Sequence, residues 1–556
     1  MDTIAQLVRV RADDDNVGLR FGADEWTYRE MVAECATRAA FLESVRTVRS
    51  AGAPVRSADA PFHVGVLLDN VPEFWFMLGA CAMSGATLVG INNTRRGAEL
   101  TRDITHTECA LVVTESAHLA MLENTVGPVY VSDEGAWAKA LAPFVGSPLP
   151  ADTVTAADTY MLIFTSGTTG APKAVRISHG KLAGWGSRLA ENFGLGPADN
   201  CYSVMPLFHS NAQVAGFTAP LAAGATTVLR PRFSASGWLP DVREYGITFF
   251  NYVGKPLTYI LATPELPDDA ENSLNIAFGN EAAPLDIDRF AQRFGCFVAD
   301  GYGSTEGGIN MGRAPGTPQG SLGQPVEPYQ AVVLDPETME ECPRARFDDA
   351  GRFLNPAEAI GEMVNPSGPG AFEGYYKNPE ADAERMRGGM YWTGDLGYRD
   401  ADGYFYFAGR NSDWLRVDGE NFAAAPVENI VARHPDVVLA AVYAVPSPDV
   451  GDDVMIALHL RDGASFDPNA FATFCTAQGD FSPKWLPRYV RVSESLPSTA
   501  TQKVLKRVLR QELWDSGDPV WWRPGRETEF RQLTDDDAQA LRAEFEARGR
   551  DHLLGR

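Results

Sequence analysis

The stretch from Phe164 to Gly180, FTSGTTGAPKAVRISHG, combines hydroxyl groups, glycines and a central lysine. Every residue from Thr165 to Gly170 is Thr, Ser or Gly, which leaves backbone N–H groups uncovered and allows tight turns. Nested N–H groups, hydroxyls and the ammonium of Lys173 suit an anion such as a polyphosphate. The spacing is not the Walker pattern, because Lys173 follows Ala171-Pro172 rather than a glycine. An ordinary flexible loop is the alternative interpretation.

A second glycine-rich stretch, DGYGSTEGG from Asp300 to Gly308, follows the apolar run CFVA. If that run is a strand, the loop lies at a carboxyl end, where α/β sheets bind ligands. Its distinctive content is the pair Thr305-Glu306, a hydroxyl beside a carboxylate. Such a pair suits Mg²⁺ held against a triphosphate, since magnesium prefers carboxylate, water and phosphate oxygens. A surface turn with an incidental glutamate is the alternative.

Three stretches nearer the C-terminus also carry candidate chemistry. In YWTGDLGYRDADGYFYFAGR, Asp395 has glycines nearby in TGDLG and can accept hydrogen bonds from two vicinal hydroxyls, as a ribose requires, and Arg410 follows fifteen residues later. In LRVDGENF, Gly419 predicts a tight turn. In LPSTATQKVLKRVLR, Lys503 stands between small hydroxylated residues and a basic run. A lysine in such a place is usually only solvated.

The elements that must position these residues are predicted to be parallel strands alternating with helices. The apolar runs HVGVLLD (63–69), ALVVT (110–114), TYMLIF (159–164), TFFNYV (248–253) and LNIAFG (274–279) are typical of strands covered on both faces. From about Gly403 the pattern changes to an antiparallel strand, GYFYFAGR. A helix near 426–434, strands near 437–445 and 454–460 and a helix near 467–478 follow.

These patterns predict an α/β fold with a large N-terminal domain of layered parallel sheets and a small mobile α+β C-terminal domain. We place the N-terminal domain at 1–409, a polar hinge at 410–413 and the C-terminal domain at 414–515. Residues 516–556 form a tail, in which we expect an amphipathic helix with a solvated surface.

Composition excludes several classes of protein. The 556 residues exceed what one core supports, and the formal net charge of −25 argues against a nucleic-acid partner. The seven cysteines are scattered without a C-x-x-C pair, which indicates reduced thiols and a cytoplasmic protein. The N-terminus does not resemble a signal peptide. The uncharged run from Phe74 to Ile91 is interrupted by glycines, so we expect a buried helix and strand there and no transmembrane span.

Taken in this order and spacing, the five stretches resemble the adenylate-forming superfamily of acyl-CoA synthetases, peptide-synthetase adenylation domains and luciferases. The likeness extends from about residue 3 to residue 515. The motifs LRVDGEN and GNE…DGYGSTEGG are most similar to those of the branch of fatty-acid transport proteins and very-long-chain acyl-CoA synthetases. The motifs are specific for ATP chemistry and much less specific for the acid.

The resemblance implies roles for particular residues. It implies a phosphate-binding loop made of Thr165, Ser166, Gly167, Thr168, Thr169, Gly170 and Lys173. It implies that adenine and ribose are bound by Tyr302, Gly303, Asp395 and Arg410. Thr305 and Glu306 would bind phosphate and Mg²⁺, and Lys503 would bridge the acid carboxylate and the α-phosphate. The acid pocket would include His209, Lys255, Gly279, Asn280 and Glu281.

By the same resemblance, the small domain rotates about a hinge at Ser412 and brings the face around Gly419 to the adenylate. Ser412 stands where Asp or Lys is usual, and Gln502 stands where the usual T-G-K has glycine. Lys255 stands where the transport-protein branch generally has Glu, so it either pairs with an anionic group of the substrate or extends to solvent or to an acidic neighbour. His209 is either beside the acid pocket or a satisfied interior histidine.

The leading hypothesis is therefore an ATP- and Mg²⁺-dependent, AMP-forming acid–CoA ligase. We expect its acid substrate to be a medium- or long-chain fatty acid, with an aromatic or steroid-like acid as the second choice. An amide ligase, or a diazotase that activates nitrite for an arylamine, is the alternative within adenylation chemistry. A non-catalytic binding protein is the alternative from another class. A homodimer is left open.

Overall fold

The computed structural model describes most of the chain. The described residues are 1–52, 61–122, 127–165, 173–314, 316–349, 351, 353–410, 414–417, 420–449, 451–499, 502–524 and 529–554. The predicted sites at Ser166, Gly167, Thr168, Thr169, Gly170, Ser412 and Gly419 lie outside these residues.

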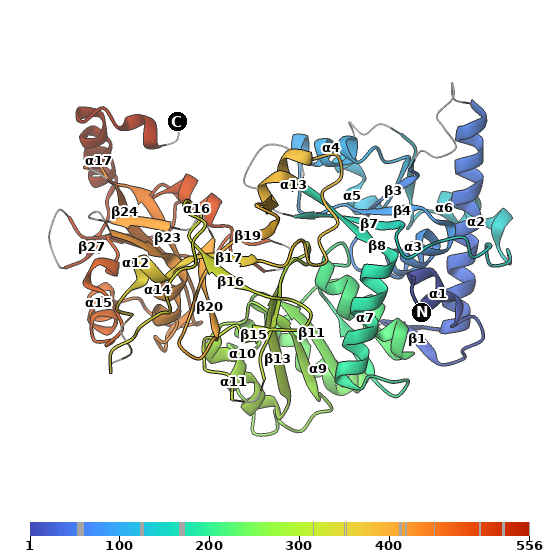
Figure 1. Cartoon of the computed structure of the whole chain (residues 1–556), viewed down its shortest axis with the longest axis horizontal. Coiled ribbons are helices and arrows are strands. Elements are labelled where there is room, and N and C mark those ends of the chain that lie inside the picture. The colour runs from blue at the N-terminus through green and yellow to red at the C-terminus, as the bar shows by residue number, and fades with distance from the viewer. Residues whose placement is uncertain are drawn as a thin grey trace.

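A six-stranded sheet of the order β6-β5-β3-β4-β7-β8 forms one layer of the N-terminal part (Figure 1). All neighbours pair in parallel except β7 and β8, which are antiparallel. The runs predicted at 63–69, 110–114 and 159–164 are indeed strands of this sheet. The bounds are β3 His63–Leu67, β4 Thr87–Gly90, β5 Leu111–Thr114, β6 Val129–Val131, β7 Thr159–Thr165 and β8 Lys173–Ser178.

A nine-stranded sheet follows the order β15-β14-β13-β12-β11-β9-β10-β1-β2, and its centre from β13 to β1 is parallel. The predicted strands near 248–253 and 274–279 are β11 and β12. The bounds are β1 Val17–Phe21, β2 Asp24–Thr27, β9 Asn200–Ser203, β10 Thr226–Leu229, β11 Phe249–Val253, β12 Ile276–Asn280, β13 Phe297–Gly303, β14 Asn310–Gly312 and β15 Gln324–Pro325.

Helices accompany these sheets because the strands are apolar on both faces and must be covered. The longer ones are α2 Tyr28–Gly52, α3 Pro72–Ser84, α4 Gly97–His106, α7 His179–Phe193, α9 Ala235–Tyr245 and α11 Pro284–Phe294. The shorter ones are α1 Ile4–Arg9, α5 Ser116–Leu119, α6 Gly135–Leu141, α8 Ala219–Ala223, α10 Pro256–Leu261, α12 Pro356–Ala359 and α13 Pro379–Arg385, and a π-helix spans Ala212–Thr218.

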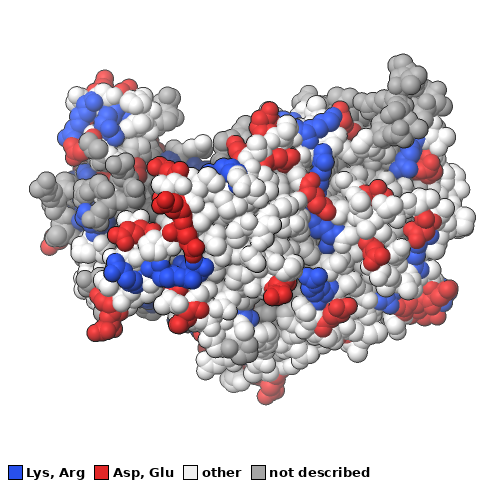
Figure 2. Space-filling view, in the orientation of Figure 1, with Lys and Arg blue, Asp and Glu red and all other residues white. Residues whose placement is uncertain are grey.

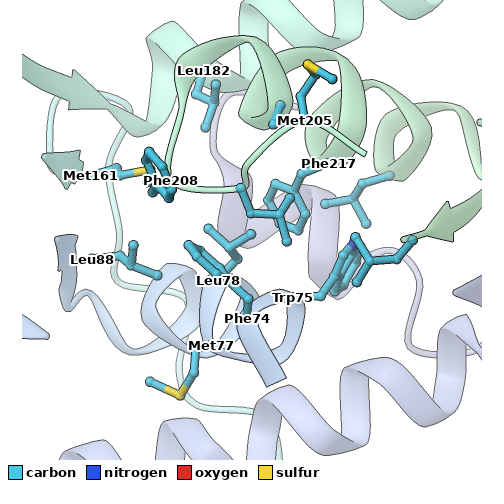
Figure 3. Packing of buried hydrophobic residues seen from close by; sticks show 14 of the residues in the cluster. Phe74, Trp75, Met77, Leu78, Leu88, Met161, Leu182, Met205, Phe208 and Phe217 are labelled. Carbon is cyan, nitrogen blue, oxygen red and sulfur yellow. The ribbon is translucent and has the colours of Figure 1, made fainter. Parts of the chain in front are cut away.

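The uncharged run after Val71 forms the centre of the largest core. Every residue of α3 from Phe74 to Met83 is buried, and β4 follows it, as expected from the sequence. Figure 3 shows Phe74 and Leu78 of α3 beneath Phe217 of the π-helix. The ring of Trp75 meets Phe217 edge to face at a centroid distance of 4.7 Å. No helix in the described part of the chain is both long enough and apolar enough to cross a membrane.

A third, antiparallel sheet joins the nine-stranded sheet to the C-terminal part. It has the order β16-β17-β19-β18, with β20 paired to β19. The predicted antiparallel strand GYFYFAGR is β20. The bounds are β16 Val332–Leu334, β17 Gly361–Asn365, β18 Met386–Arg387, β19 Met390–Arg399 and β20 Phe405–Arg410.

The small C-terminal part is α+β and lies at the opposite end of the molecule from α2 (Figure 1). A ribbon of β21 and β22 precedes a sheet of the order β23-β24-β25-β26-β27. The strands are β21 Trp414–Val417, β22 Glu420–Ala423, β23 Val437–Pro446, β24 Asp452–Leu460, β25 Tyr489–Val492, β26 Val520–Trp522 and β27 Arg531–Gln532. The helices are α14 Ala424–Val431, α15 Pro468–Thr476, α16 Lys506–Glu512 and α17 Asp535–Ala547. The elements predicted near 426–434, 437–445, 454–460 and 467–478 are α14, β23, β24 and α15.

The tail differs from its prediction. The amphipathic helix is present as α17, capped by Thr534, but its surface is not simply solvated. Leu541 and Phe545 of α17 are buried in one cluster with Trp514 and Trp522, and β26 pairs with β25. The expectation of a solvated helix is wrong because the apolar stripe of α17 has a sheet face to cover.

Charged side chains of both signs are interspersed on the face in Figure 2, with a broad uncharged area between them. The net charge of −25 is therefore not gathered into a single acidic patch on that face.

Candidate active site

The two ends of the predicted phosphate loop face each other across a hairpin. Thr165 ends β7, Lys173 begins β8, and the two residues are partners in the antiparallel ladder. The Lys173 side chain is buried, and its Nζ donates to Glu384 Oε2 of α13 at 3.0 Å. Lys173 is therefore held at the base of the hairpin by an ion pair.

Thr305 and Glu306 lie directly beyond the carboxyl end of β13, and both are buried. The Thr305 hydroxyl is 2.8 Å from the hydroxyl of Ser210. Glu306 Oε1 accepts a hydrogen bond of 2.8 Å from the Tyr375 hydroxyl. A buried carboxylate beside a hydroxyl, both at a sheet edge, is a donor set that suits Mg²⁺ with phosphate oxygens.

Lys181 of α7 supports this turn, and sequence reasoning missed it. Its Nζ donates to the carbonyl oxygens of Thr305 at 3.3 Å and Glu306 at 3.0 Å. Burial lowers the pKa of Lys181 to about 8, although Glu373 and Glu306 oppose the shift. A helical lysine is normally solvated, so only its position next to the glycine-rich stretch could have drawn attention to it.

Tyr302, Asp395 and Arg410 come together from two sheets. Asp395 of β19 and Arg410 of β20 are cross-strand partners, and Arg410 Nε is 3.4 Å from Asp395 Oδ1. The Tyr302 hydroxyl, on β13, donates to Asp395 Oδ2 at 2.7 Å. The carboxylate is thus oriented from both sides. Gly303 is exposed at the end of β13, beside Tyr302.

Lys503 reaches from the small C-terminal part into the N-terminal site. Its Nζ is 2.6 Å from Glu281 Oε1, just beyond the carboxyl end of β12. His209 lies close enough to both for its pKa to respond to their charges. Burial and, to a smaller extent, the charge of Lys503 lower the pKa of His209 to about 4, against the opposing effect of Glu281. The structure therefore brings three predicted residues from distant parts of the chain to one place.

The short hairpin before α16 positions Lys503. Its backbone N–H donates to the Thr499 hydroxyl at 3.1 Å, and its carbonyl accepts from the Thr499 N–H at 2.8 Å. Gln502 has φ +62°, in the left-handed region. The glycine of the related T-G-K pattern suits that region, and here a glutamine adopts it.

Gly279 and Asn280 end β12 next to Glu281. A Cβ at Gly279 would lie 2.3 Å from the carbonyl oxygen of Tyr252, so only glycine allows this close approach of strands. The side-chain oxygen of Asn280 is buried and has no hydrogen-bond partner among the described residues.

Lys255 stands two residues after Val253, which pairs with Asn280 across β11 and β12. It precedes α10 and lines a cavity of about 1040 Å³ between α10, α11 and the small part, with α14 and β23 on the far wall. The wall of this cavity includes Lys255 but not Lys503, Glu281 or His209, and both interpretations of the Lys255 side chain stay predictions.

A separate group that the sequence did not reveal lies beyond β3 and β5. Potential ligand atoms of Asp69, Glu115 and His118 lie within 4.8 Å of one another. His118 Nε2 is 2.9 Å from Asp69 Oδ1, and Glu115 accepts from the Asp69 N–H at 2.7 Å. These bonds tie the two loops together.

The fold and site define an enzyme built from a large α/β part and a small part that contributes a lysine to the site. A family model described as AMP-binding enzyme matches residues 8–376, and a model of the AMP-binding enzyme C-terminal domain matches residues 426–503. The chain belongs to the AMP-binding enzyme family.

The chain is similar to curated CoA ligases over nearly its full length. Steroid-22-oyl-CoA synthetase of Rhodococcus jostii is 47% identical over 559 residues, which cover 99% of each chain. Medium/long-chain-fatty-acid–CoA ligase FadD17 of Mycobacterium marinum is 48% identical over 519 residues, which cover 93% of this chain and 98% of the relative.

Solved structures confirm the fold at lower identity. The anthranilate CoA ligase AuaEII, solved in complex with anthranoyl-AMP, matches with a TM-score of 0.77 at 24% identity. The match covers 91% of this chain and 96% of the AuaEII chain. The amide bond synthetase McbA of Marinactinospora thermotolerans has a TM-score of 0.72 at 24% identity, covering 92% and 99%.

Proposed function

We propose that the chain is an ATP-dependent, AMP-forming acid–CoA ligase with two half-reactions. The acid carboxylate first attacks the α-phosphorus of ATP and pyrophosphate leaves. The CoA thiol then attacks the carbonyl carbon of the acyl-adenylate, loses its proton, and AMP leaves. The observation that carries the proposal is the position of Lys503, whose Nζ already contacts a carboxylate in the N-terminal site at 2.6 Å.

We assign nucleotide binding to groups at the sheet edges. Asp395, oriented by Tyr302 and Arg410, would accept hydrogen bonds from the two ribose hydroxyls. The loop between Thr165 and Lys173 would bind the β- and γ-phosphates. Thr305 and Glu306 would hold Mg²⁺, which supplies neutralisation of the charge on the polyphosphate.

Lys503 would act during adenylation. The acid carboxylate and the α-phosphate repel each other, and an ammonium fixed between them stabilises the charge that develops in the transition state. Holding the two reactants in line also lowers the entropic part of the barrier. His209, with its pKa lowered to about 4 by burial and by Lys503, is neutral at pH 7 and therefore adds no second positive charge beside Lys503.

We assign the second half-reaction to a rotated arrangement of the small part. Rotation about the hinge near Ser412 would withdraw Lys503 and present the face around Gly419 to the adenylate. AMP is a far better leaving group than oxide, so the thiol attack needs no second activation step.

For the acid, we propose a medium- or long-chain fatty acid or a steroid-like carboxylic acid. The support is 47% identity to a steroid-22-oyl-CoA synthetase and 48% identity to a medium/long-chain-fatty-acid–CoA ligase, both over most of the chain. Lys255 lines the cavity between the two parts, whose wall does not include Glu281, His209 or Lys503, and its pairing with a second anionic group of the acid stays a prediction.

The test is release of AMP and pyrophosphate by the purified protein with Mg·ATP and a panel of acids, with and without CoA. The panel contains fatty acids of graded length, a steroid with a side-chain carboxylate, benzoate and nitrite. The proposal predicts AMP release that requires one carboxylic acid and ends in a CoA thioester. Turnover that ignores CoA but requires an amine or nitrite would replace the proposal with an amide ligase or a diazotase.

A further inference from the structure

The contact between Lys503 and Glu281 joins the two parts of the molecule at the place where the acid carboxylate should bind. The two atoms are 2.6 Å apart, and the residues are separated by 222 positions in the chain. The Lys503 side chain is 29% exposed and the Glu281 side chain 43% exposed, so the pair lies in a space that a ligand can enter.

The backbone at Glu281 aims this carboxylate into the site. Glu281 has φ +67°, a left-handed conformation that is uncommon for a residue other than glycine. It follows directly on β12, whose Gly279 is pressed against the carbonyl of Tyr252. Strained residues of this kind concentrate at functional sites, where the surrounding structure holds them in place.

The charges around Glu281 favour its ionised form. Desolvation by the surrounding protein raises the pKa of Glu281. Lys503 lowers it through its charge and a hydrogen bond, and the charges of Arg410 and His209 also lower it. The net pKa of Glu281 is therefore below the usual range. Glu281 therefore presents a full negative charge to the ammonium of Lys503 at neutral pH.

We propose that Glu281 is a positioning residue that holds the place of the substrate carboxylate on Lys503 and is displaced when the acid binds. The inference rests on the proposed function, since it assigns the acid to the same ammonium. Two carboxylates beside one ammonium in a half-buried site repel each other, so the acid replaces Glu281 rather than joining it. In the absence of substrate the pair keeps the small part closed over the N-terminal site.

The first experiment measures this contact without any substrate. Isotope-coded reductive methylation of the full-length protein, read by peptide mass spectrometry, gives the reaction rate of each lysine. In Glu281→Gln the freed Lys503 should react about threefold to fivefold faster, the factor expected for losing a partly exposed ion pair. Lys506, three residues away and paired with Glu428 at 2.8 Å, is the matched internal control and should keep its rate.

Two further variants separate charge from folding. Glu281→Asp retains a carboxylate and tolerates the left-handed conformation, so its Lys503 rate should lie closer to the wild type. Glu281→Gly fits φ +67° without strain, so it replaces the glutamine variant if that protein does not fold. An unchanged rate at Lys503 in the folded Gln or Gly variant overturns the proposal.

The second experiment is kinetic. Removing a carboxylate that competes with the acid should lower the KM for the acid about threefold to fivefold, while the KM for ATP stays constant. A higher KM for the acid would show that Glu281 assists acid binding and would overturn the proposal. If no acid–CoA ligation is found, the proposed function fails, but the labelling experiment still decides whether Glu281 holds Lys503.

Discussion

At the level of single residues, the position of the Lys503 ammonium depends on an unusual backbone next to it. Gln502 has φ +62°, its N–H donates to the Thr499 carbonyl at 2.9 Å, and the Lys503 carbonyl accepts from the Thr499 N–H at 2.8 Å. A residue other than glycine in the left-handed region costs about 1–2 kcal/mol. Gln502 therefore keeps the geometry that a glycine would adopt more easily.

We expect Gln502→Gly to leave folding stability unchanged or to raise it by up to about 1 kcal/mol, because relief of strain exceeds the entropic cost of glycine. Urea denaturation of the small part measures the effect. The matched control is Gln511→Gly within α16, where helical φ makes the same change destabilising by about 1 kcal/mol. Equal losses of stability in Gln502→Gly and Gln511→Gly would contradict the left-handed conformation of Gln502.

Lys503→Ala should slow adenylation by about 10²–10³-fold, the usual effect of removing one group that stabilises transition-state charge. A preformed acyl-adenylate should still react with CoA at a rate close to that of the wild type, because the proposed mechanism withdraws the lysine in that step. Single-turnover measurement of each half-reaction checks this. Equal loss in both would show that Lys503 does not have the role proposed.

Asp300, on β13, gives a prediction about pH. Its Oδ2 accepts from the Tyr252 hydroxyl at 2.8 Å and the Ala282 N–H at 3.2 Å. Burial raises the pKa of Asp300 from 3.8 to about 7, against the lowering effect of those bonds. Between these values the folded state holds a proton that the unfolded state has lost, so stability falls as pH rises from about 4 to about 7.

Asp300→Asn removes this loss of stability at higher pH, while it keeps the shape of the side chain and one hydrogen-bond acceptor. We expect the midpoint of urea denaturation of the variant to rise relative to the wild type between pH 4.5 and pH 7.5. A constant difference across this range would mean that Asp300 is ionised throughout.

At the level of elements, the turn after β13 is held in place by a side chain of helix α7. Lys181 of α7 bridges the carbonyl oxygens of Thr305 and Glu306. The helix thereby fixes the turn that carries the proposed magnesium ligands.

The π-helix Ala212–Thr218 begins three residues after His209, and such wide turns are frequent at functional sites.

Lys181→Met should leave both carbonyl oxygens without this donor and cost about 1–3 kcal/mol of stability. Because the turn loosens, we expect the KM for Mg·ATP to rise about tenfold and the KM for the acid to change much less. Steady-state kinetics with each substrate varied in turn measures both. Lys139→Met, at an exposed position of α6, is the control and should be neutral. A rise of the acid KM alone would exclude the role given to Lys181.

At the level of the whole molecule, the C-terminal tail completes the small part. Strand β26 extends its sheet, and α17 covers a cluster containing Trp514 and Trp522. The proposed withdrawal of Lys503 requires the small part to move as one body, and the tail adds to the core that would keep it rigid. We infer that the tail stabilises the part that carries the lysine.

Phe545→Ala should destabilise the small part by about 3–5 kcal/mol, since it removes a fully buried aromatic side chain. Tryptophan fluorescence during thermal unfolding reports the loss, because Trp514 lies against Phe545 with a ring-centroid distance of 6.3 Å. Leu553→Ala, at a position that is 38% exposed, is the control. A similar small loss in both variants would show that the tail is not part of this core.

Much of the fold could be read from local pattern. Apolar runs such as TYMLIF and TFFNYV are strands because only a sheet covered on both faces accepts them, and α3 is a buried helix for a similar reason. The types of the reactive groups were also evident from local sequence: the hydroxyl beside Glu306, the aspartate of TGD, and the isolated Lys503.

Tertiary structure decided which of these groups meet. No local pattern brings Lys503 to Glu281, pairs Tyr302 with Asp395, or places Lys181 beneath the turn at Glu306, because each contact joins segments more than ninety residues apart. The tail was misjudged for the same reason: an amphipathic stripe tells which face of α17 is apolar, but only the assembled sheet shows what that face covers.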